Sequence, residues 1–424
     1  MRLNRDAIRR KLPSNLDELA LETGALLRRR EIKCAEQLLW MTLMYSGLVE
    51  PSLRQTSAIG GITGDFELND TSVRYRLKNA PEFLTAVLNS LLFGADRALR
   101  ADGVSRRICL QDATTVSFPG SDGTDFRLHT EYVPGQGLAY VEITDRRGGE
   151  SLERGEYRPG DIVIADQGLA YAKSIHHVCS TGAYCLIRCY LQNIKLQGED
   201  GVRLKPERIL DLADQGASSI PVLVPHEDAA PIRARLVMAK LPAEAAARAR
   251  EKLRKQASKK QKSISELAMR LAGYVVILTT VPADELSDSE VLHTYRLRWQ
   301  IELFFKRCKS LLGLDKLKAH GAVARAWLLG KMIIATLVDR ALAGIYREWA
   351  YKRSGAVPSL WPLTKLCLMD LQATILDVER VLPSLDESAL RRLGEAPRKK
   401  RKAAAVDIAR LNKKLNPSAR RVRP

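Results

Sequence analysis

Two aspartates in this chain stand at the ends of short apolar runs that are expected to be strands. Asp112 follows the run 108–111, Ile-Cys-Leu-Gln, and Asp166 follows the run 162–165, Ile-Val-Ile-Ala. Carboxylates held at the mouths of buried strands can share a hard divalent cation, because Mg²⁺ takes oxygen ligands and is usually held by one or two carboxylates. Each aspartate taken alone fits a turn former or a helix cap as well.

A third carboxylate lies on a helix expected to begin near Ser287. The apolar residues of this helix repeat at intervals of three and four along one side, as in a helix packed on a core. Glu302 lies on the opposite side, and an ordinary surface helix does not explain what accompanies it there. At about 100° per residue, one stripe about 60° wide combines this carboxylate with a phenol and two cations: Tyr295, Arg298 and Lys309.

These residues resemble the signature of a known enzyme family. The spacing Tyr295-x2-Arg298-x3-Glu302-x6-Lys309 matches without a gap the signature of DDE transposases of the insertion-sequence-four type, and the two aspartates resemble that family's pair. The resemblance covers about residues 50–345. It implies an α/β fold, in which a ribonuclease-H-like catalytic core carries an inserted β-rich domain and is flanked by an N-terminal helical DNA-binding domain and by C-terminal helices.

The resemblance also implies a chemistry. Asp112, Asp166 and Glu302 would be the catalytic residues and the metal ligands of two Mg²⁺ ions, for which Mn²⁺ would substitute. One ion would activate a water or a 3′-hydroxyl, and the other would stabilise the leaving oxygen of an in-line displacement at phosphorus. The implied reaction is cut-and-paste transposition, in which a 3′-hydroxyl at each transposon end forms a DNA hairpin that is reopened before strand transfer.

Other side chains are expected to contact DNA. Arg298 and Lys309 would hold phosphates beside the scissile bond through charge-assisted hydrogen bonds. Tyr295 would hydrogen-bond a phosphate near a flipped nucleotide, or else pack on a neighbouring element. The family stacks the flipped base on an aromatic side chain, most familiarly a tryptophan, and Tyr274 occupies that place here. A tyrosine buried in the core of the inserted domain is at least as good an interpretation of Tyr274.

The hydrophobic periodicity changes along the chain and divides it into five segments. The expected boundaries are 1–105 for the helical DNA-binding domain, 106–180 for the first part of the catalytic core, 181–282 for the β-rich insertion, 283–385 for the second part of the core with the C-terminal helices, and 386–424 for a basic tail.

The first segment contains a pattern typical of a helix-turn-helix DNA reader. A helix over about 52–59 is followed by a glycine turn that begins at Gly60 and by a second helix over about 70–78. A solvated basic helix face explains the second helix equally well. The basic residues concerned are Arg74, Arg76 and Lys78.

The chain is strongly basic, with 68 Lys and Arg against 49 Asp and Glu and a formal net charge of +19. Such a charge indicates a polyanion partner, and nucleic acid is favoured over a membrane surface. The run 398–402 fits a DNA clamp, and a Lys- and Arg-rich helix over 243–271 would lie along a DNA backbone or be a solvated face. The implied partners are double-stranded DNA at transposon ends, target DNA, and a second copy of the chain in a paired-end complex.

Membrane and export functions are not expected. The apolar stretch 322–346 contains four charged residues, so it should be a buried helix rather than a membrane span. The N-terminus is basic and lacks the apolar region of a signal peptide. The seven cysteines, an odd number, suggest reduced thiols. These features indicate a cytoplasmic location, and the family resemblance implies that it is bacterial and at the nucleoid.

Two other functions stay open on the sequence alone. A transposase-derived DNA-binding protein without activity would keep the basic surfaces but would not need all three acids. A metal-dependent nuclease of the same fold would cleave DNA without joining it, and its residues could be the same.

Overall fold

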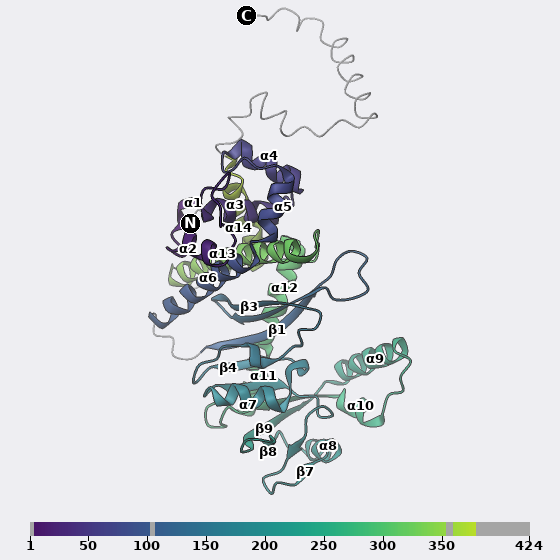
Figure 1. Ribbon diagram of the computed structural model, residues 1–424. Coiled ribbons are helices and arrows are strands. Elements are labelled where there is room, and N and C mark those ends of the chain that lie inside the picture. The colour runs from purple at the N-terminus through teal and green to yellow at the C-terminus, as the bar shows by residue number, and fades with distance from the viewer. Residues whose placement is uncertain (1–3, 102–106, 353–358, 379–424) are drawn as a thin grey trace, which may run out of the picture.

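The computed structural model of the protein describes residues 4–101, 107–352 and 359–378. Figure 1 shows the N-terminal helices gathered at one end of the molecule together with two C-terminal helices, and a long sheet that extends from them toward the opposite end. The basic tail expected at 386–424 lies outside the described residues.

A sheet of ten strands runs through the described part of the chain in the order β3-β2-β1-β4-β5-β10-β9-β8-β6-β7. β1, β4 and β5 run parallel to one another, while β2 pairs antiparallel with β1 and β3 pairs antiparallel with β2. The buried strand expected at 162–165 is confirmed as β4. These first five strands are β1 (Ile108–Val116), β2 (Phe126–Val133), β3 (Gly137–Asp145), β4 (Ile162–Ala165) and β5 (Tyr184–Arg188).

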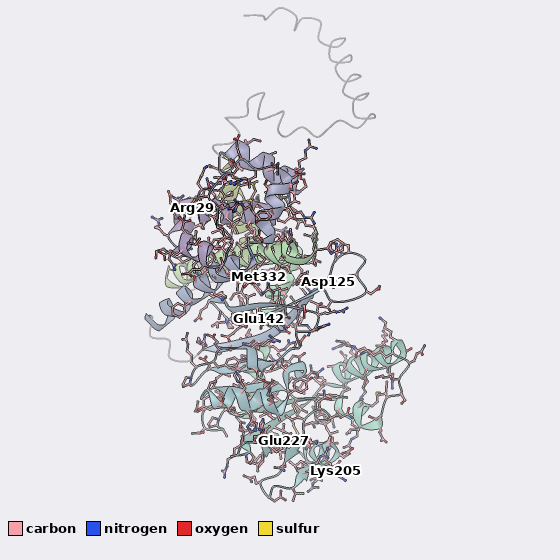
Figure 2. All side chains as sticks on the ribbon, in the orientation of Figure 1. Arg29, Asp125, Glu142, Lys205, Glu227 and Met332 are labelled. Atoms are coloured by element: carbon pink, nitrogen blue, oxygen red, sulfur yellow. The ribbon has the colours of Figure 1, made fainter. Side chains whose placement is uncertain are left out.

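The other five strands extend the same sheet beyond β5. β10 pairs antiparallel with β5, and β9 pairs antiparallel with β10, so β9 runs in the same direction as β1, β4 and β5. Lys205 marks the far end of the sheet in Figure 2. The segment 181–282 thus joins its strands to the sheet of the preceding segment. Besides β5, the strands of this segment are β6 (Leu196–Gln197), β7 (Arg203–Leu204), β8 (Ser219–Val224), β9 (Ile232–Lys240) and β10 (Tyr274–Thr279).

In the described part of the chain, six helices precede the sheet. The fourth begins with a capping box formed by Ser52 and Gln55. It continues through Gly60, so the expected turn there is wrong, and it ends at Gly64, whose φ is 67°. Gly60 serves packing instead, because a Cβ at this residue would lie 2.1 Å from the Phe66 ring. The six helices are α1 (Arg5–Arg9), α2 (Leu16–Glu22), α3 (Ala35–Ser46), α4 (Leu53–Thr63), α5 (Asp70–Lys78) and α6 (Pro81–Ala101).

The long helix α13 (Gly321–Lys352) forms the centre of the helical end of the molecule. It packs against α3, α5, α6, β3 and the last described helix, α14 (Leu360–Ile375). By length and composition its segment Gly321–Ile345 could cross a membrane, but 83% of the most apolar window is buried inside the protein. The buried helix expected at 322–346 is therefore confirmed.

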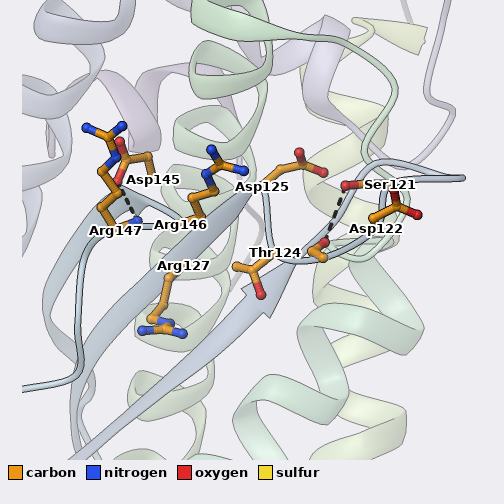
Figure 3. Close-up of a pocket in the computed structure, with 9 residues that line it drawn as sticks. Ser121, Asp122, Thr124, Asp125, Arg127, Asp145, Arg146 and Arg147 are labelled. Atoms are coloured by element: carbon orange, nitrogen blue, oxygen red, sulfur yellow. Dashed lines mark hydrogen bonds between the residues drawn. The ribbon is translucent and has the colours of Figure 1, made fainter.

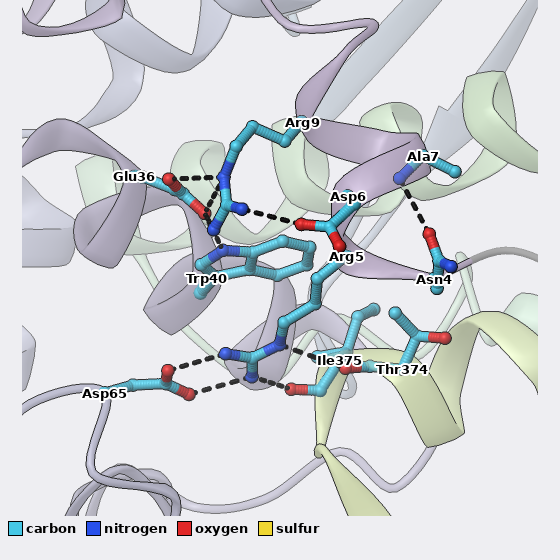
Figure 4. A network of polar contacts seen from close by, with 10 residues as sticks. All are labelled: Asn4, Arg5, Asp6, Ala7, Arg9, Glu36, Trp40, Asp65, Thr374 and Ile375. Carbon is cyan, nitrogen blue, oxygen red and sulfur yellow. Dashed lines mark hydrogen bonds and ion pairs between the residues drawn. The ribbon is translucent and has the colours of Figure 1, made fainter.

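The end of α1 is tied to the end of α14 by Arg5 (Figure 4). Its guanidinium makes two hydrogen bonds to the Asp65 carboxylate, of 2.6 and 2.8 Å, and donates to Ile375 O at 3.0 Å. The same guanidinium lies over the Trp40 ring, 4.8 Å from the ring centroid. The first and last described helices and the turn after α4 are thus held together in one unit.

The signature segment forms two α-helices joined by a short 3₁₀ turn. These are α11 (Asp288–Tyr295), η3 (Arg296–Arg298) and α12 (Trp299–Leu312). The expected helix start near Ser287 is confirmed, since this residue caps α11. The expectation of one uninterrupted helix through the signature is wrong, because η3 separates α11 from α12. The φ and ψ angles of Arg296 are −61° and −23°, the values of a 3₁₀-helix, so the backbone stays in the right-handed helical region through the turn. The signature side chains therefore keep nearly the same face.

A buried lysine of α13 fixes the end of α12. Lys331 is fully buried, and its Nζ donates to Leu312 O at 2.6 Å and to Gly47 O at 3.3 Å, and pairs with Glu50 at 2.9 Å. Gly47 is the C-cap of α3, so one ammonium satisfies carbonyls at the ends of two helices. This contact fixes the helix of Glu302 relative to the N-terminal helices.

The remaining described helices lie between β3 and β10 in the sequence. The basic helix expected over 243–271 is broken after Lys259, so the expectation of one helix is wrong. Ser265 starts the second piece by accepting a hydrogen bond from Ala268 N at 3.2 Å. Figure 1 shows α9 and α10 projecting on the same side as the loop between β1 and β2. These helices are η1 (Leu152–Arg154), η2 (Gln167–Leu169), α7 (Ala172–Ser180), α8 (Pro206–Asp214), α9 (Ala243–Lys259) and α10 (Glu266–Leu271).

Candidate active site

Asp112 and Asp166 come together because β1 and β4 run parallel. The register places Gln111 opposite Ala165, so the two aspartates are the next residues on neighbouring strands. Asp112 was expected to follow its strand, and this is wrong, because β1 continues to Val116 by pairing with β2. The pairing with β4 ends before Asp112, so the carboxylate still lies at the mouth of the parallel pair.

The signature helices bring Glu302 to the two aspartates. Arg298 forms an ion pair with Glu302, and its Nη1 lies 3.8 Å from Asp112 Oδ2. The Tyr295 hydroxyl donates to Asp166 Oδ1 at 3.4 Å. The Arg298 guanidinium lies 6.0 Å from the centroid of the Tyr295 ring. Five of the residues predicted from the sequence thus lie in one site, with the arginine and the tyrosine between the three acids.

Burial is the largest influence on Asp112 and raises its pKa from 3.8 to about 6. A hydrogen bond from Ala113 N and the charge of Arg298 lower this pKa, whereas the charges of Glu150 and Asp166 raise it. At neutral pH the carboxylate is therefore ionised in an environment that penalises its charge. A cation bound beside it would relieve that penalty.

The Tyr295 hydroxyl is held in its protonated form. Burial and the nearby charge of Asp166 raise the pKa of Tyr295 well above its usual value. Burial alone would lower the pKa of Arg298, but Tyr295, Asp166 and Glu302 together raise it. At neutral pH both side chains are consequently hydrogen-bond donors, which suits them to an anionic partner.

The donor set of the site suits a hard divalent cation, since all three acids offer carboxylate oxygens. Among the residues that the structure describes, however, no three Asp, Glu, His or Cys side chains are grouped closely enough to hold a metal ion. Arg298 takes the place of a cation, because its guanidinium pairs with Glu302 and faces Asp112. Joint coordination by Asp112, Asp166 and Glu302 therefore requires the Arg298–Glu302 pair to open.

Lys309 lies on the same side of α12 as Glu302 but two turns further along, at a rise of about 10 Å. Its side chain is half-buried. Along α12 it lies on the other side of Glu302 from Arg298.

Arg188 was missed by the sequence analysis. β5 lies beside β4 with Ile187 opposite Ala165, so Arg188 stands at the level of Asp166 on the next strand. Its charge lowers the pKa of Tyr295. The available signal was a cation directly after a buried strand, but the sequence does not reveal that this strand neighbours β4.

Trp299 was missed as well. It directly follows Arg298 and is 57% exposed, which is unusual for so large an apolar side chain. The sequence signal was a tryptophan inside the signature window, and only the structure shows that it faces solvent rather than the core.

Tyr274 is the first residue of β10 and is 8% exposed. Its ring belongs to a hydrophobic cluster that extends from the insertion strands to Cys109 of β1 and Val163 of β4, and its hydroxyl donates to Asp214. The Lys240 ammonium lies 6.0 Å from the ring centroid. This is a buried strand position, and stacking a base on Tyr274 would require its ring to become exposed.

The helix expected to read DNA is α5. It exposes Arg74 and Lys78 to solvent, while Arg76 is half-buried and donates from Nη2 to Arg28 O at 3.2 Å. A groove of about 530 Å³ runs along α4 and the turn before α5. The order of helix, turn and helix expected for this segment is present, with the turn at Gly64.

A pocket of about 720 Å³ opens beyond the site at the end of the β1–β2 hairpin (Figure 3). Four residues separate Asp112 from the end of β1, a length of about 13 Å along the strand. Arg127 at this pocket donates to Gly148 O at 2.8 Å. The charged residues that line the pocket are of both signs and include none of the signature residues: Asp122, Asp125, Arg127, Asp145, Arg146 and Arg147.

Residues 105–337 match the family model described as "Transposase DDE domain", which is more than half of the chain. This range contains the described strands of the sheet and the signature helices. The chain therefore belongs to the DDE transposase family, and it is a DNA transposase, an enzyme that cleaves DNA and transfers strands. Membership also implies dependence on a divalent metal.

Curated relatives agree with this assignment. The chain is 32% identical over 335 residues to the transposase for insertion sequence element IS421 of Escherichia coli, covering 77% of this chain and 90% of that protein. It is 33% identical, with the same coverage, to the putative transposase InsL for insertion sequence element IS186A of Escherichia coli strain K12. It is 25% identical over 349 residues to the transposase for insertion sequence element IS231F of Bacillus thuringiensis subsp. israelensis, covering 72% of each chain. The resemblance read from the signature is confirmed.

Proposed function

We propose that this transposase excises and inserts its element by two-metal phosphoryl transfer at Asp112, Asp166 and Glu302. The observation that supports this proposal is their convergence: three acids from distant parts of the sequence contact one Tyr295–Arg298 pair. Each acid would be a metal ligand and a catalytic residue.

The strand arrangement supports a ribonuclease-H-like core. Five strands follow the order β3-β2-β1-β4-β5, with β1, β4 and β5 parallel and β2 and β3 antiparallel. The acids come from adjacent parallel strands and from a helix packed on them. In this proposal 106–180 and 283–385 form the core, 181–282 contributes β5 to that core and otherwise forms its insertion, and 1–105 is the DNA-binding domain.

The three carboxylates would hold two Mg²⁺ ions, with Mn²⁺ as a substitute, because both metals accept carboxylate oxygens. When bound, the ions would activate a water or a 3′-hydroxyl and stabilise the leaving oxygen. Asp112 is the ligand whose charge burial penalises, as its raised pKa shows, so it would gain most from a bound cation.

The signature cations and the phenol would hold the DNA strand. When its ion pair with Glu302 opens, the N–H donors of the Arg298 guanidinium become free and would bind a phosphate instead. The protonated Tyr295 hydroxyl would donate to a phosphate oxygen. Lys309 and Arg188 would add positive charge on either side of the scissile bond.

The DNA steps would follow the family pattern. A hairpin would form at each transposon end within a paired-end complex of two copies of the chain, before transfer to target DNA. α5 would contact end DNA through Arg74, Arg76 and Lys78. Trp299 would stack a base near the scissile phosphate, because it is exposed beside the site and Tyr274 is buried. The named relatives are bacterial, which supports a cytoplasmic location at the nucleoid.

Cleavage and strand transfer test this proposal separately. Asp112→Asn, Asp166→Asn and Glu302→Gln should each abolish Mg²⁺-dependent cleavage of labelled end DNA while binding of that DNA persists. Asp122→Asn, in an exposed loop outside the site, should keep both activities. Wild-type protein should also join pre-cut ends to a target, which a nuclease would not. Cleavage retained by any of the three site variants would remove that residue from the ligand set.

A further inference from the structure

The helix α9 starts at the edge of the sheet that carries the candidate active site. β9 runs in the same direction as β1, β4 and β5, so its last residue, Lys240, lies at the edge where those strands end. α9 begins three residues later, at Ala243. Figure 1 shows it projecting from the sheet on the side of the loop that follows β1.

The strand register shows how far α9 stands from the carboxylates. Arg188, at the level of Asp166, pairs with Ile277, whereas Lys240 pairs with Tyr274. The end of β9 is therefore three residues of β10 beyond the level of Asp166, about 10 Å along the strand. β9 lies three strands away from β4, about 14 Å across the sheet, and α9 begins three residues after the end of β9. These lengths are within the span of a short duplex whose scissile phosphate lies at the site, since duplex DNA rises about 3.4 Å for each base pair.

One face of α9 is turned to the protein. Ala246 is buried, and Leu253 and Ala257 are half-buried. Arg250 belongs to the same face, since its Nε donates to Met269 O at 3.1 Å. At about 100° per residue, the four α9 positions fall within about 60° of one another.

The opposite face of α9 is a stripe of exposed cations. Its members recur at intervals of four, three and four residues, and fall within about 60° on the far side from Ala246. The stripe extends over a rise of about 16 Å and is here called the α9 basic stripe: Arg248, Lys252, Lys255 and Lys259.

Two glutamates pair with members of this stripe without neutralising it. Arg248 lies 3.6 Å from Glu244, and Lys255 lies 2.7 Å from Glu251, each four residues apart on the helix. Exposed pairs of this kind contribute about 0–1 kcal/mol and are screened by salt. A stronger polyanion can therefore replace both glutamates at low cost.

We propose that the α9 basic stripe binds the phosphate backbone of duplex DNA at the candidate active site. This inference rests on the proposed function, because it takes the duplex to be the substrate of Asp112, Asp166 and Glu302. Duplex DNA carries a negative charge about every 1.7 Å along its axis when both strands are counted, so a length of about 16 Å carries about ten phosphates, of which one side of the duplex presents a part to the four cations. The stripe is predominantly lysine, which suits phosphate contact without base reading.

A membrane surface is a poorer partner for the same stripe. Helices that lie on membranes place large apolar side chains beside their basic face. The apolar leucine of α9, Leu253, is on the inner face, and the outer face carries cations, alanine and polar residues.

The test removes the four charges and measures DNA binding without catalysis. The stripe variant carries Arg248→Gln, Lys252→Gln, Lys255→Gln and Lys259→Gln, which leave the inner face of α9 unchanged. A matched control removes four exposed charges near the far end of the sheet: Lys195→Gln, Arg203→Gln, Lys205→Gln and Arg208→Gln. Affinity for the end duplex is measured in EDTA between 50 and 300 mM salt.

The slope of log affinity against log salt should become shallower by about 0.9 for each phosphate that the protein no longer neutralises, or by about two to four in the stripe variant. The control should change by less than one. The same affinity is measured in a second arm for an unrelated target duplex, offered to protein that already holds pre-cut transposon ends. A change of slope in only one arm identifies the DNA that occupies the stripe. Equal slopes for the stripe variant and the control in both arms would overturn the proposal.

Failure of this inference is distinguishable from failure of the proposed function. Cleavage by wild-type protein and its loss in Asp112→Asn are measured in Mg²⁺ and do not depend on the salt slopes. Cleavage that requires Asp112, together with unchanged slopes, would reject the α9 contact alone.

Discussion

Replacing Asp112 by asparagine is expected to stabilise the protein at neutral pH while removing its activity. Burial raises the pKa of Asp112 from 3.8 to about 6, so between these values the folded protein keeps a proton that the unfolded chain releases. The proton on Asp112 therefore stabilises the folded protein relative to its ionised form. This stabilisation is fully present below the pKa of the unfolded state and is lost as the pH rises through the pKa of the folded state. Asparagine has nearly the same shape and no charge, so the variant avoids that loss.

The size of the effect follows from the pKa shift. A rise of about two units at about 1.36 kcal/mol per unit corresponds to about 3 kcal/mol above pH 7. The Asp112 side chain is 22% exposed, so solvent screening reduces this only moderately. We expect the free energy of unfolding of Asp112→Asn to exceed that of wild type by about 2–3 kcal/mol at pH 7.5 and by about 0.5 kcal/mol at pH 4.

Urea unfolding in EDTA at the two pH values measures this difference, with Asp122→Asn as the exposed control. Adding Mg²⁺ should then stabilise wild type more than Asp112→Asn, because a cation that binds the folded state shifts the unfolding equilibrium. A variant no more stable than wild type at pH 7.5, or with an equal advantage at pH 4, would refute the reasoning.

Three other substitutions test separate parts of the account. Arg298→Ala removes a charge that lowers the pKa of Asp112, so the acidic limb of the cleavage pH profile should move to higher pH, and an unmoved limb would contradict the contact. Trp299→Ala should raise the barrier to hairpin formation by about 1–3 kcal/mol but leave the rate of the first nick unchanged, with both products resolved on denaturing gels. Equal losses in the rates of the two steps would argue against stacking. Gly60→Ala should lower the free energy of unfolding by about 1–3 kcal/mol, because its Cβ would lie 2.1 Å from an aromatic ring, whereas Gly123→Ala meets nothing within 4 Å and should be neutral.

Elements whose signal is local were predictable from the sequence. The strand at 162–165 is a run of buried apolar residues, and the helix start at Ser287 has a capping box that lies within four residues. Because period and capping depend on neighbouring residues, they can be read without the fold. The signature spacing likewise placed Glu302 with Arg298 before any contact was known.

Contacts set by strand pairing were not predictable. Arg188 stands beside Asp166 only because β5 pairs with β4, and the sequence does not show which strands are neighbours. The burial of Tyr274 has a similar cause, since it packs in a hydrophobic cluster shared with strands as distant in the sequence as β1 and β4. The spacing of Arg298 and Glu302 gave one face but not their mutual ion pair, which depends on the charges present in the site.

The central claim is that Asp112, Asp166 and Glu302 bind divalent metal together. The most direct measurement is a crystal structure of the protein with its end DNA and Mn²⁺, in which anomalous scattering locates the metal. We expect Mn²⁺ bound by all three carboxylates and Arg298 turned from Glu302 to a DNA phosphate. Mn²⁺ bound elsewhere, or bound without one of these acids, would contradict the account.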